Sequence, residues 1–114
     1  MKLPLERRVA FAMGAALCLL SGLGHALAAA GRSGEAQALL DELTGMGARV
    51  WVPPYFPALV AAGLGQTEAA MEHLEEACRK RDPYLVWLKC DPRFDALRTQ
   101  AGFQDLLRRV GLLA

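Results

Sequence analysis

Aromatic residues are scarce in this sequence, and neither sign of charge dominates. Phe, Trp and Tyr together make up 7% of the 114 residues, whereas 54% are hydrophobic, so burial depends mainly on Ala, Leu and Val. Such small side chains suit helices that pack closely against one another. The formal net charge is +1 at pH 7. This balance gives no electrostatic reason to expect a nucleic-acid partner or an acidic substrate. The length allows one domain at most.

Cysteine is also scarce, and its spacing excludes the common metal motifs. Cys18, Cys78 and Cys90 are an odd number with no C-x-x-C pair. Odd, widely spaced cysteines in an intracellular chain are typical of unpaired thiols rather than of a disulfide framework. We therefore expect reduced, mostly buried thiols in a reducing compartment and no zinc site.

The residue patterns of the common enzyme classes are missing. The glycines form no Gly-x-Gly-x-x-Gly or Walker sequence that would hold a phosphate. Ser21 lies inside a predicted helix rather than after a strand, so it lacks the context of a nucleophile elbow. His25 and His73 have no acidic partner at metal-ligand spacing, and we expect His73 on an exposed, charged helix face. These observations predict a protein that is not an enzyme and that has no cofactor, catalytic residue or metal site.

The main internal feature is a partial repeat: the residue types of positions 20–43 recur 34 residues later in the sequence. With that offset Gly31 falls on Gly65, Ala36 on Ala70 and Leu40 on Leu74. Within the first copy, four apolar residues follow the i, i+3, i+4, i+7 spacing of one helix face: Ala36, Leu39, Leu40 and Leu43. A period of about 34 residues with two helices is the spacing of tetratricopeptide repeats.

The first copy also fits the residue pattern of that family. The W-x2-L-G-x2-Y places are taken by Leu20, Leu23, Gly24 and Leu27, and the A-x3-F places by Ala36 and Leu40. The chain therefore resembles a tetratricopeptide-repeat protein. The resemblance implies an all-α fold, in which antiparallel helix-turn-helix repeats stack as a short right-handed superhelix with a C-terminal helical cap. It also implies a non-catalytic scaffold that binds a protein or peptide.

The 34-residue repeat pattern, which we call the register, divides the single expected domain, residues 1–114, into four parts. These are a remnant helix of an earlier repeat at 5–13, repeat 1 at 15–46, repeat 2 at 53–80 and capping helices at 83–114. We expect Gly14 to end the remnant helix. Ser33 and Thr67 are expected to cap the second helix of each repeat, because their hydroxyl groups can accept an orphan backbone N–H. Gly24 is expected to bring the two helices of repeat 1 close together. Whether the chain is a fragment of a longer repeat protein stays open.

The C-terminal third carries a second resemblance. LKCDPRFDALR at residues 88–98, followed by FQDLL at 103–107, resembles a recurring tail that closes tetratricopeptide arrays in bacterial multidomain proteins. These proteins include winged-helix regulators, adenylate cyclases and Ser/Thr kinases with repeat extensions. An open stack needs such a cap, because its last apolar face would otherwise be left in water.

The N-terminal region allows a different interpretation. Residues 9–31 carry no formal charge if His25 is neutral, which is long enough for a membrane-spanning helix. Basic residues before this run and Ala26-Leu27-Ala28 near its end also imitate a secretory signal. The alternative is thus an exported or membrane-anchored small helical protein, with residues 1–30 as signal peptide or anchor. The 34-residue register instead favours a soluble cytoplasmic repeat. A helix that is buried on two sides inside a repeat stack is itself apolar nearly all round, so burial in the stack already explains the uncharged run.

The resemblance also implies a partner-binding groove along the first helix of each repeat. Its register places six residues there: Ser21, His25, Ala28, Tyr55, Leu59 and Ala62. Most are small or apolar, so the groove would prefer an apolar or helical segment of a protein partner of unknown identity. The basic clamp with which some members hold a carboxylate is absent. The same positions could instead pack against upstream repeats, and the open N-terminal end could self-associate. A membrane is a partner only under the alternative interpretation.

Overall fold

A computed structural model describes the backbone of residues 5–111 and the side chains of residues 14–111. Within this range all regular secondary structure is helical and no strand occurs, which confirms the expected all-α class. The five α-helices and two 3₁₀ helices are α1 (Leu5–Ala29), α2 (Ser33–Met46), α3 (Tyr55–Gly63), α4 (Thr67–Arg79), η1 (Pro83–Trp87), η2 (Pro92–Leu97) and α5 (Ala101–Arg109).

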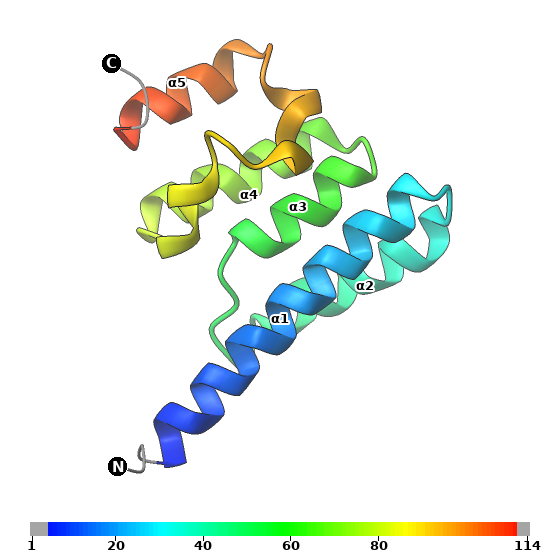
Figure 1. The fold of residues 1–114 in the computed structure, drawn as a ribbon, viewed down its shortest axis with the longest axis vertical. Helices are drawn as coiled ribbons and strands as arrows, with labels where there is room; N and C mark the ends of the chain where they lie inside the picture. The colour runs from blue at the N-terminus through cyan, green and yellow to red at the C-terminus, as the bar shows by residue number, and fades with distance from the viewer. Residues whose placement is uncertain (1–4, 112–114) are drawn as a thin grey trace.

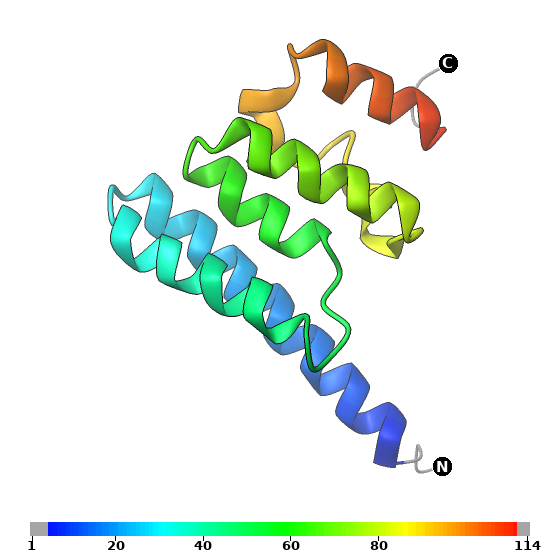
Figure 2. The same cartoon turned by 180° about the vertical axis from the view of Figure 1, so that it is seen from behind.

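The helices form two hairpins and a cap. α1 pairs with α2, α3 pairs with α4, and α3 lies between the first hairpin and η2 (Figure 1). α5 packs against α4 at the other end of the molecule, as the view from behind also shows (Figure 2). The N-terminal turns of α1, drawn in blue, extend away from the other helices in both views. The principal-axis extents are 45 × 37 × 23 Å.

The two hairpin turns have the same geometry 34 residues apart. Gly31 and Gly65 adopt φ values of 82° and 75°, a region that glycine enters without steric cost. The Gly31 N–H donates to Ala28 O, and the Gly65 N–H donates to Ala62 O, both at 3.1 Å. The next N–H in each turn reaches five residues back, which completes the Schellman pattern of a helix end. The repeat seen in the sequence is therefore also a repeat of backbone hydrogen bonds.

The apolar helix faces largely match the sequence prediction. Leu39 alone among the four predicted α2 residues is only half-buried. The buried residues of α2, α4 and α5 are Ala36, Leu40, Leu43, Ala70, Leu74, Ala77, Phe103, Leu106 and Leu107. α3 is the central element, since every residue from Tyr55 to Ala62 is buried. A helix surrounded on all sides is apolar throughout, as its sequence YFPALVAAG is.

Three local expectations about helix ends and contacts are wrong. α1 runs through Gly14 without a break, because one glycine costs a helix only about 1 kcal/mol relative to alanine. Ser33 and Thr67 are the first helical residues rather than the caps, and neither α2 nor α4 has a side-chain cap hydrogen bond. Gly24 faces Val60 of α3, so it brings the two hairpins together rather than the two helices of one repeat.

Two expectations about polar side chains also need correction. Cys18 and Cys90 are exposed and only Cys78 is partly buried. On α4 the i, i+4 spacing of Glu75 and Arg79 predicts an ion pair between them, but Glu75 instead pairs with Arg109 of α5. The tertiary contact between α4 and α5 thus replaces a pair within one helix.

Crossing a membrane needs a helix that is both long and strongly apolar, and no helix within residues 5–111 meets this requirement. Residues 112–114 of the expected cap lie outside the described range.

Candidate partner-binding surface

The six predicted groove residues lie on the facing helices α1 and α3, but most of them are inaccessible. Ser21, Tyr55 and Leu59 are at most 1% exposed, and Ala62 is 8% exposed. His25 and Ala28 are partly exposed and border Gly63 of α3. Partner binding by these six residues stays a prediction, and only the two on α1 are reachable from solvent in this conformation.

The cap of the chain itself covers the α3 part of this groove. η2 packs on α3, and the Phe94 ring meets the Tyr55 ring edge-on at a centroid distance of 5.3 Å. The Tyr84 ring of η1 also stacks on Tyr55, with a centroid distance of 6.3 Å. The C-terminal segment therefore occupies the place where a peptide would have to lie along α3.

A buried polar network fixes this cap. The Asp91 carboxylate accepts hydrogen bonds from the Tyr55 hydroxyl at 2.6 Å and from the Arg93 side chain at 2.9 Å. Burial raises the pKa of the Tyr55 phenol well above its usual value, and the bond to Asp91 raises it further. Burial would also raise the pKa of Asp91, but the hydrogen bonds from Arg93 and Tyr55 outweigh it and lower that pKa. These groups are satisfied by one another, so the network is structural.

Ser21 makes a local bond that explains its burial. Its hydroxyl donates to the Cys18 carbonyl oxygen at 2.9 Å, one turn earlier in α1. Serine commonly satisfies its hydroxyl in this way inside a helix. No described side-chain N or O atom that is fully buried lacks a hydrogen-bond partner. Ser21 is therefore a satisfied core residue.

An apolar cavity of about 320 Å³ opens next to the N-terminal half of α1. α1, the loop between α2 and α3, and η1 together supply its described lining residues, none of which is charged: Gly14, Leu17, Val50, Trp51, Pro53, Pro83 and Tyr84. We call this the aromatic cavity. Pockets of this size with mostly apolar walls and one or two polar groups are typical binding sites. The Tyr84 hydroxyl supplies such a polar group.

Large apolar side chains are exposed in the lining of the aromatic cavity and elsewhere on η1. Trp51 is 54% exposed, and Trp87 and Val86 of η1 are 59% and 65% exposed. The Lys80 ammonium group lies 5.4 Å from the centroid of the Trp51 ring, which places a cation on its face. Exposed tryptophans are enriched at the centres of protein interfaces. Sequence reasoning did not find this site, although a tryptophan in a proline-containing loop was the available signal.

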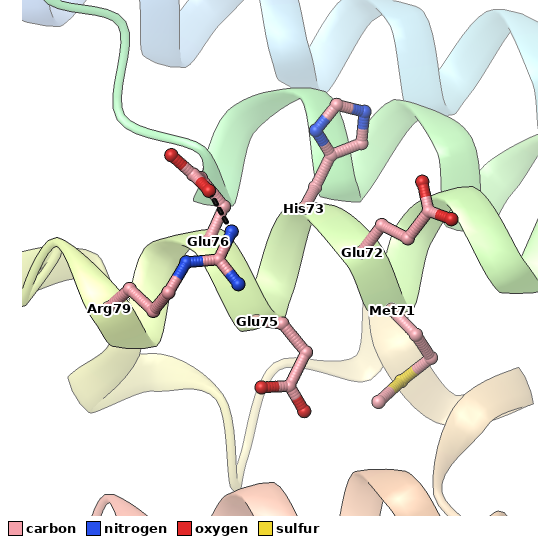
Figure 3. Close-up of a pocket in the computed structure, with 6 residues that line it drawn as sticks. All are labelled: Met71, Glu72, His73, Glu75, Glu76 and Arg79. Atoms are coloured by element: carbon pink, nitrogen blue, oxygen red, sulfur yellow. Dashed lines mark hydrogen bonds and ion pairs between the residues drawn. The ribbon is translucent and has the colours of Figure 1, made fainter.

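A second, larger hollow lies along α4 (Figure 3). It has a volume of about 670 Å³ and is lined by Met71, Glu72, His73, Glu75, Glu76 and Arg79. All of these residues come from one helix, and their side chains spread apart except for the Glu76–Arg79 pair (Figure 3). No group of three or more potential metal ligands occurs within the described residues. The hollow therefore lacks the convergent geometry that catalysis or metal binding requires.

His73 lies partly buried at the edge of this hollow rather than on a fully exposed face. Its imidazole also lines a smaller hollow of about 160 Å³ with Leu43 and Pro57. Desolvation lowers the pKa of His73, and Glu72 and Glu76 oppose that effect without cancelling it. The side chain is thus held mainly in its neutral form against the apolar rim.

Comparison with known proteins identifies no relative. No protein-family model, curated protein or solved structure matches the chain at a significant level. Function is therefore inferred from the residues and contacts of the chain alone. Among them, the aromatic cavity is the surface best suited to recognition.

Proposed function

We propose that the chain is a non-catalytic protein-interaction module of the tetratricopeptide type. The two stacked hairpins with matching helix ends 34 residues apart support this type of repeat. In such a module α1 and α3 are the groove-lining helices, and the hairpins stack as a short right-handed superhelix closed by η1, η2 and α5. The module acts in the cytoplasm of a bacterium and docks a partner protein or another part of its own parent protein.

The single observation that carries the binding function is the aromatic cavity with Trp51 at its mouth. Because its described walls carry no charge, the partner contributes an apolar side chain rather than an acidic tail. The partner segment then continues along α1 past the partly exposed His25 and Ala28. Because η2 packs on α3, the α3 residues of the groove do not contact the partner and only support the helices that do.

Capture experiments with matched tryptophan variants test this function. The two tryptophans are similarly exposed, but only Trp51 lines the cavity. We expect Trp51→Ala to reduce the amount of partner captured from the native cell extract by about tenfold or more, as truncation of an interface hot spot does. Trp87→Ala is the matched control and should retain capture. Equal capture by wild type and Trp51→Ala, with unchanged helicity, would show that the cavity is not the binding site.

A further inference from the structure

The aromatic cavity is flanked by cationic side chains. Arg49 lies in the loop between α2 and α3, one residue before the part of that loop that lines the cavity. Arg81 lies two residues before the lining residues of η1. The Lys80 ammonium group lies 5.4 Å from the centroid of the Trp51 ring at the mouth of the cavity. All three cationic side chains are exposed, and we call Arg49, Lys80 and Arg81 the basic rim.

The nearby carboxylates offset only part of the charge of the basic rim. Glu76 pairs with Lys80 at 2.9 Å and also with Arg79, so two cations share one carboxylate. Asp82 is 3% exposed, and its two carboxylate oxygens accept hydrogen bonds from backbone N–H groups inside the fold. Its charge is therefore directed away from solvent, and the cations that solvent reaches at this end of α4 outnumber the carboxylates.

The two arginines of the basic rim are open to a ligand. Neither Arg49 nor Arg81 forms an ion pair with any residue that the structure describes. Exposed charges act over about 8 Å at physiological ionic strength. An extended segment advances about 3.3 Å per residue. A charged side chain one to three positions from a residue that is bound in the aromatic cavity therefore lies within reach of the basic rim.

We propose that the partner segment carries acidic residues within three positions of the apolar residue that enters the aromatic cavity. This inference rests on the proposed function, because it requires the cavity to be the binding site. The apolar residue supplies the buried contact, and the acidic residues supply charge complementarity, which speeds association and disfavours segments with basic flanks. The acidic groups are side chains within the segment rather than its terminal carboxylate, because the described walls of the cavity hold no cation.

Selection from a random library of short peptides displayed on phage tests this inference. The peptides are fused to the coat protein through their C-terminus, so no free terminal carboxylate contributes to binding. Among the peptides that the wild type captures and Trp51→Ala does not, Asp and Glu should exceed Lys and Arg next to a large apolar residue. We expect an excess of about threefold or more over the unselected library, as exposed ion pairs produce. The excess should shrink when the selection is run in about 0.5 M salt, which screens the rim.

Variants of the basic rim identify the charges responsible. In the rim variant, Arg49→Glu is combined with Arg81→Asn, because Arg81 has a φ of 54°, which Asn tolerates. Lys80 is kept, since it packs on the ring at the mouth of the cavity. The rim variant should select apolar residues without acidic flanks. Lys89→Glu with Arg108→Asn is the matched control, because both residues are exposed outside the rim, and it should keep the acidic preference.

The outcomes separate this inference from the proposed function. Peptides that need Trp51 but show no excess of acidic flanks overturn the inference and leave the cavity as the binding site. An equal excess in the wild type and the rim variant does the same. Equal capture by the wild type and Trp51→Ala, or no enrichment at all, overturns both. Circular dichroism checks that each variant stays helical, and Arg49→Glu alone repeats the test without changing the end of α4.

Discussion

The hydroxyl of Tyr55 donates a 2.6 Å hydrogen bond to the carboxylate of Asp91, which lies 36 residues later in the chain. The backbone N–H of the same tyrosine donates to a second carboxylate, that of Asp82, at 3.0 Å. Asp82 also accepts from the Tyr84 N–H, so it begins η1 while it holds the start of α3. The first turn of the central helix is therefore fixed by the cap, and we expect α3 and the cap to unfold together.

Removing the Tyr55 hydroxyl should weaken this connection. A hydrogen bond to a charged group contributes about 1.5–3 kcal/mol, so Tyr55→Phe should lower the free energy of unfolding by roughly that amount. Tyr84→Phe is the matched control, because the Tyr84 hydroxyl makes no hydrogen bond to a described residue, and it should change stability little. Urea unfolding followed by circular dichroism measures both variants. If the two variants lost the same stability, the Tyr55–Asp91 bond would contribute nothing specific.

Close contact between the hairpins predicts opposite effects for two glycines. A Cβ atom at Gly24 would lie 2.8 Å from Cγ2 of Val60, whose β-branched side chain has few alternative rotamers. Gly24→Ala should therefore destabilise the fold by about 1–3 kcal/mol through overpacking. Gly34 of α2 has open space around its Cβ position, so Gly34→Ala should stabilise by up to about 1 kcal/mol.

A double-mutant cycle identifies the cause of the Gly24 effect. If the clash with Val60 is responsible, Val60→Ala should recover part of the stability that Gly24→Ala loses, as a coupling energy of about 0.5 kcal/mol or more. Independent, additive effects of the two substitutions in thermal or urea unfolding would instead point to a contact elsewhere.

Local features of the fold were predictable from the sequence. Helix faces follow from the spacing of Leu40, Leu74 and Phe103 with their apolar neighbours, because this spacing depends only on the helical period. The turns at Gly31 and Gly65 follow from the need for a residue that adopts positive φ. Both features depend only on residues that lie within one or two turns of each other in the same helix.

The contacts between distant segments were not predictable in the same way. Burial of Tyr55 depends on η2, and the partner of Glu75 is Arg109, 34 residues away. Nothing in either local pattern specifies which distant segment will lie against it. The aromatic cavity depends on three separate segments, and Trp51 alone gave no periodic pattern to recognise. Sequence reasoning therefore found the helices but misplaced the accessible surface.

Burial of His73 makes stability depend on pH in a defined direction. Because desolvation lowers its pKa below 6.5 in the folded state, His73 is neutral in both states well above that pH and affects stability little there. As the pH falls below about 6.5, the unfolded chain binds the proton more readily, so the free energy of unfolding decreases by at most about 1.4 kcal/mol per pH unit. The decrease stops once the pH has passed the lowered pKa of the folded state.

Comparison with His73→Gln isolates this contribution. Urea unfolding of both proteins at several pH values between about 7.5 and about 5 should show a smaller loss of stability in the variant. The lowered pKa of Asp91 means that this carboxylate takes up its proton at a higher pH in the unfolded chain than in the folded one. Both proteins should therefore lose further stability at more acidic pH, near and below about 4. If the curves of wild type and His73→Gln stay parallel through the upper range, His73 does not sense pH. Its imidazole would then be solvated in solution, rather than held against Leu43 and Pro57.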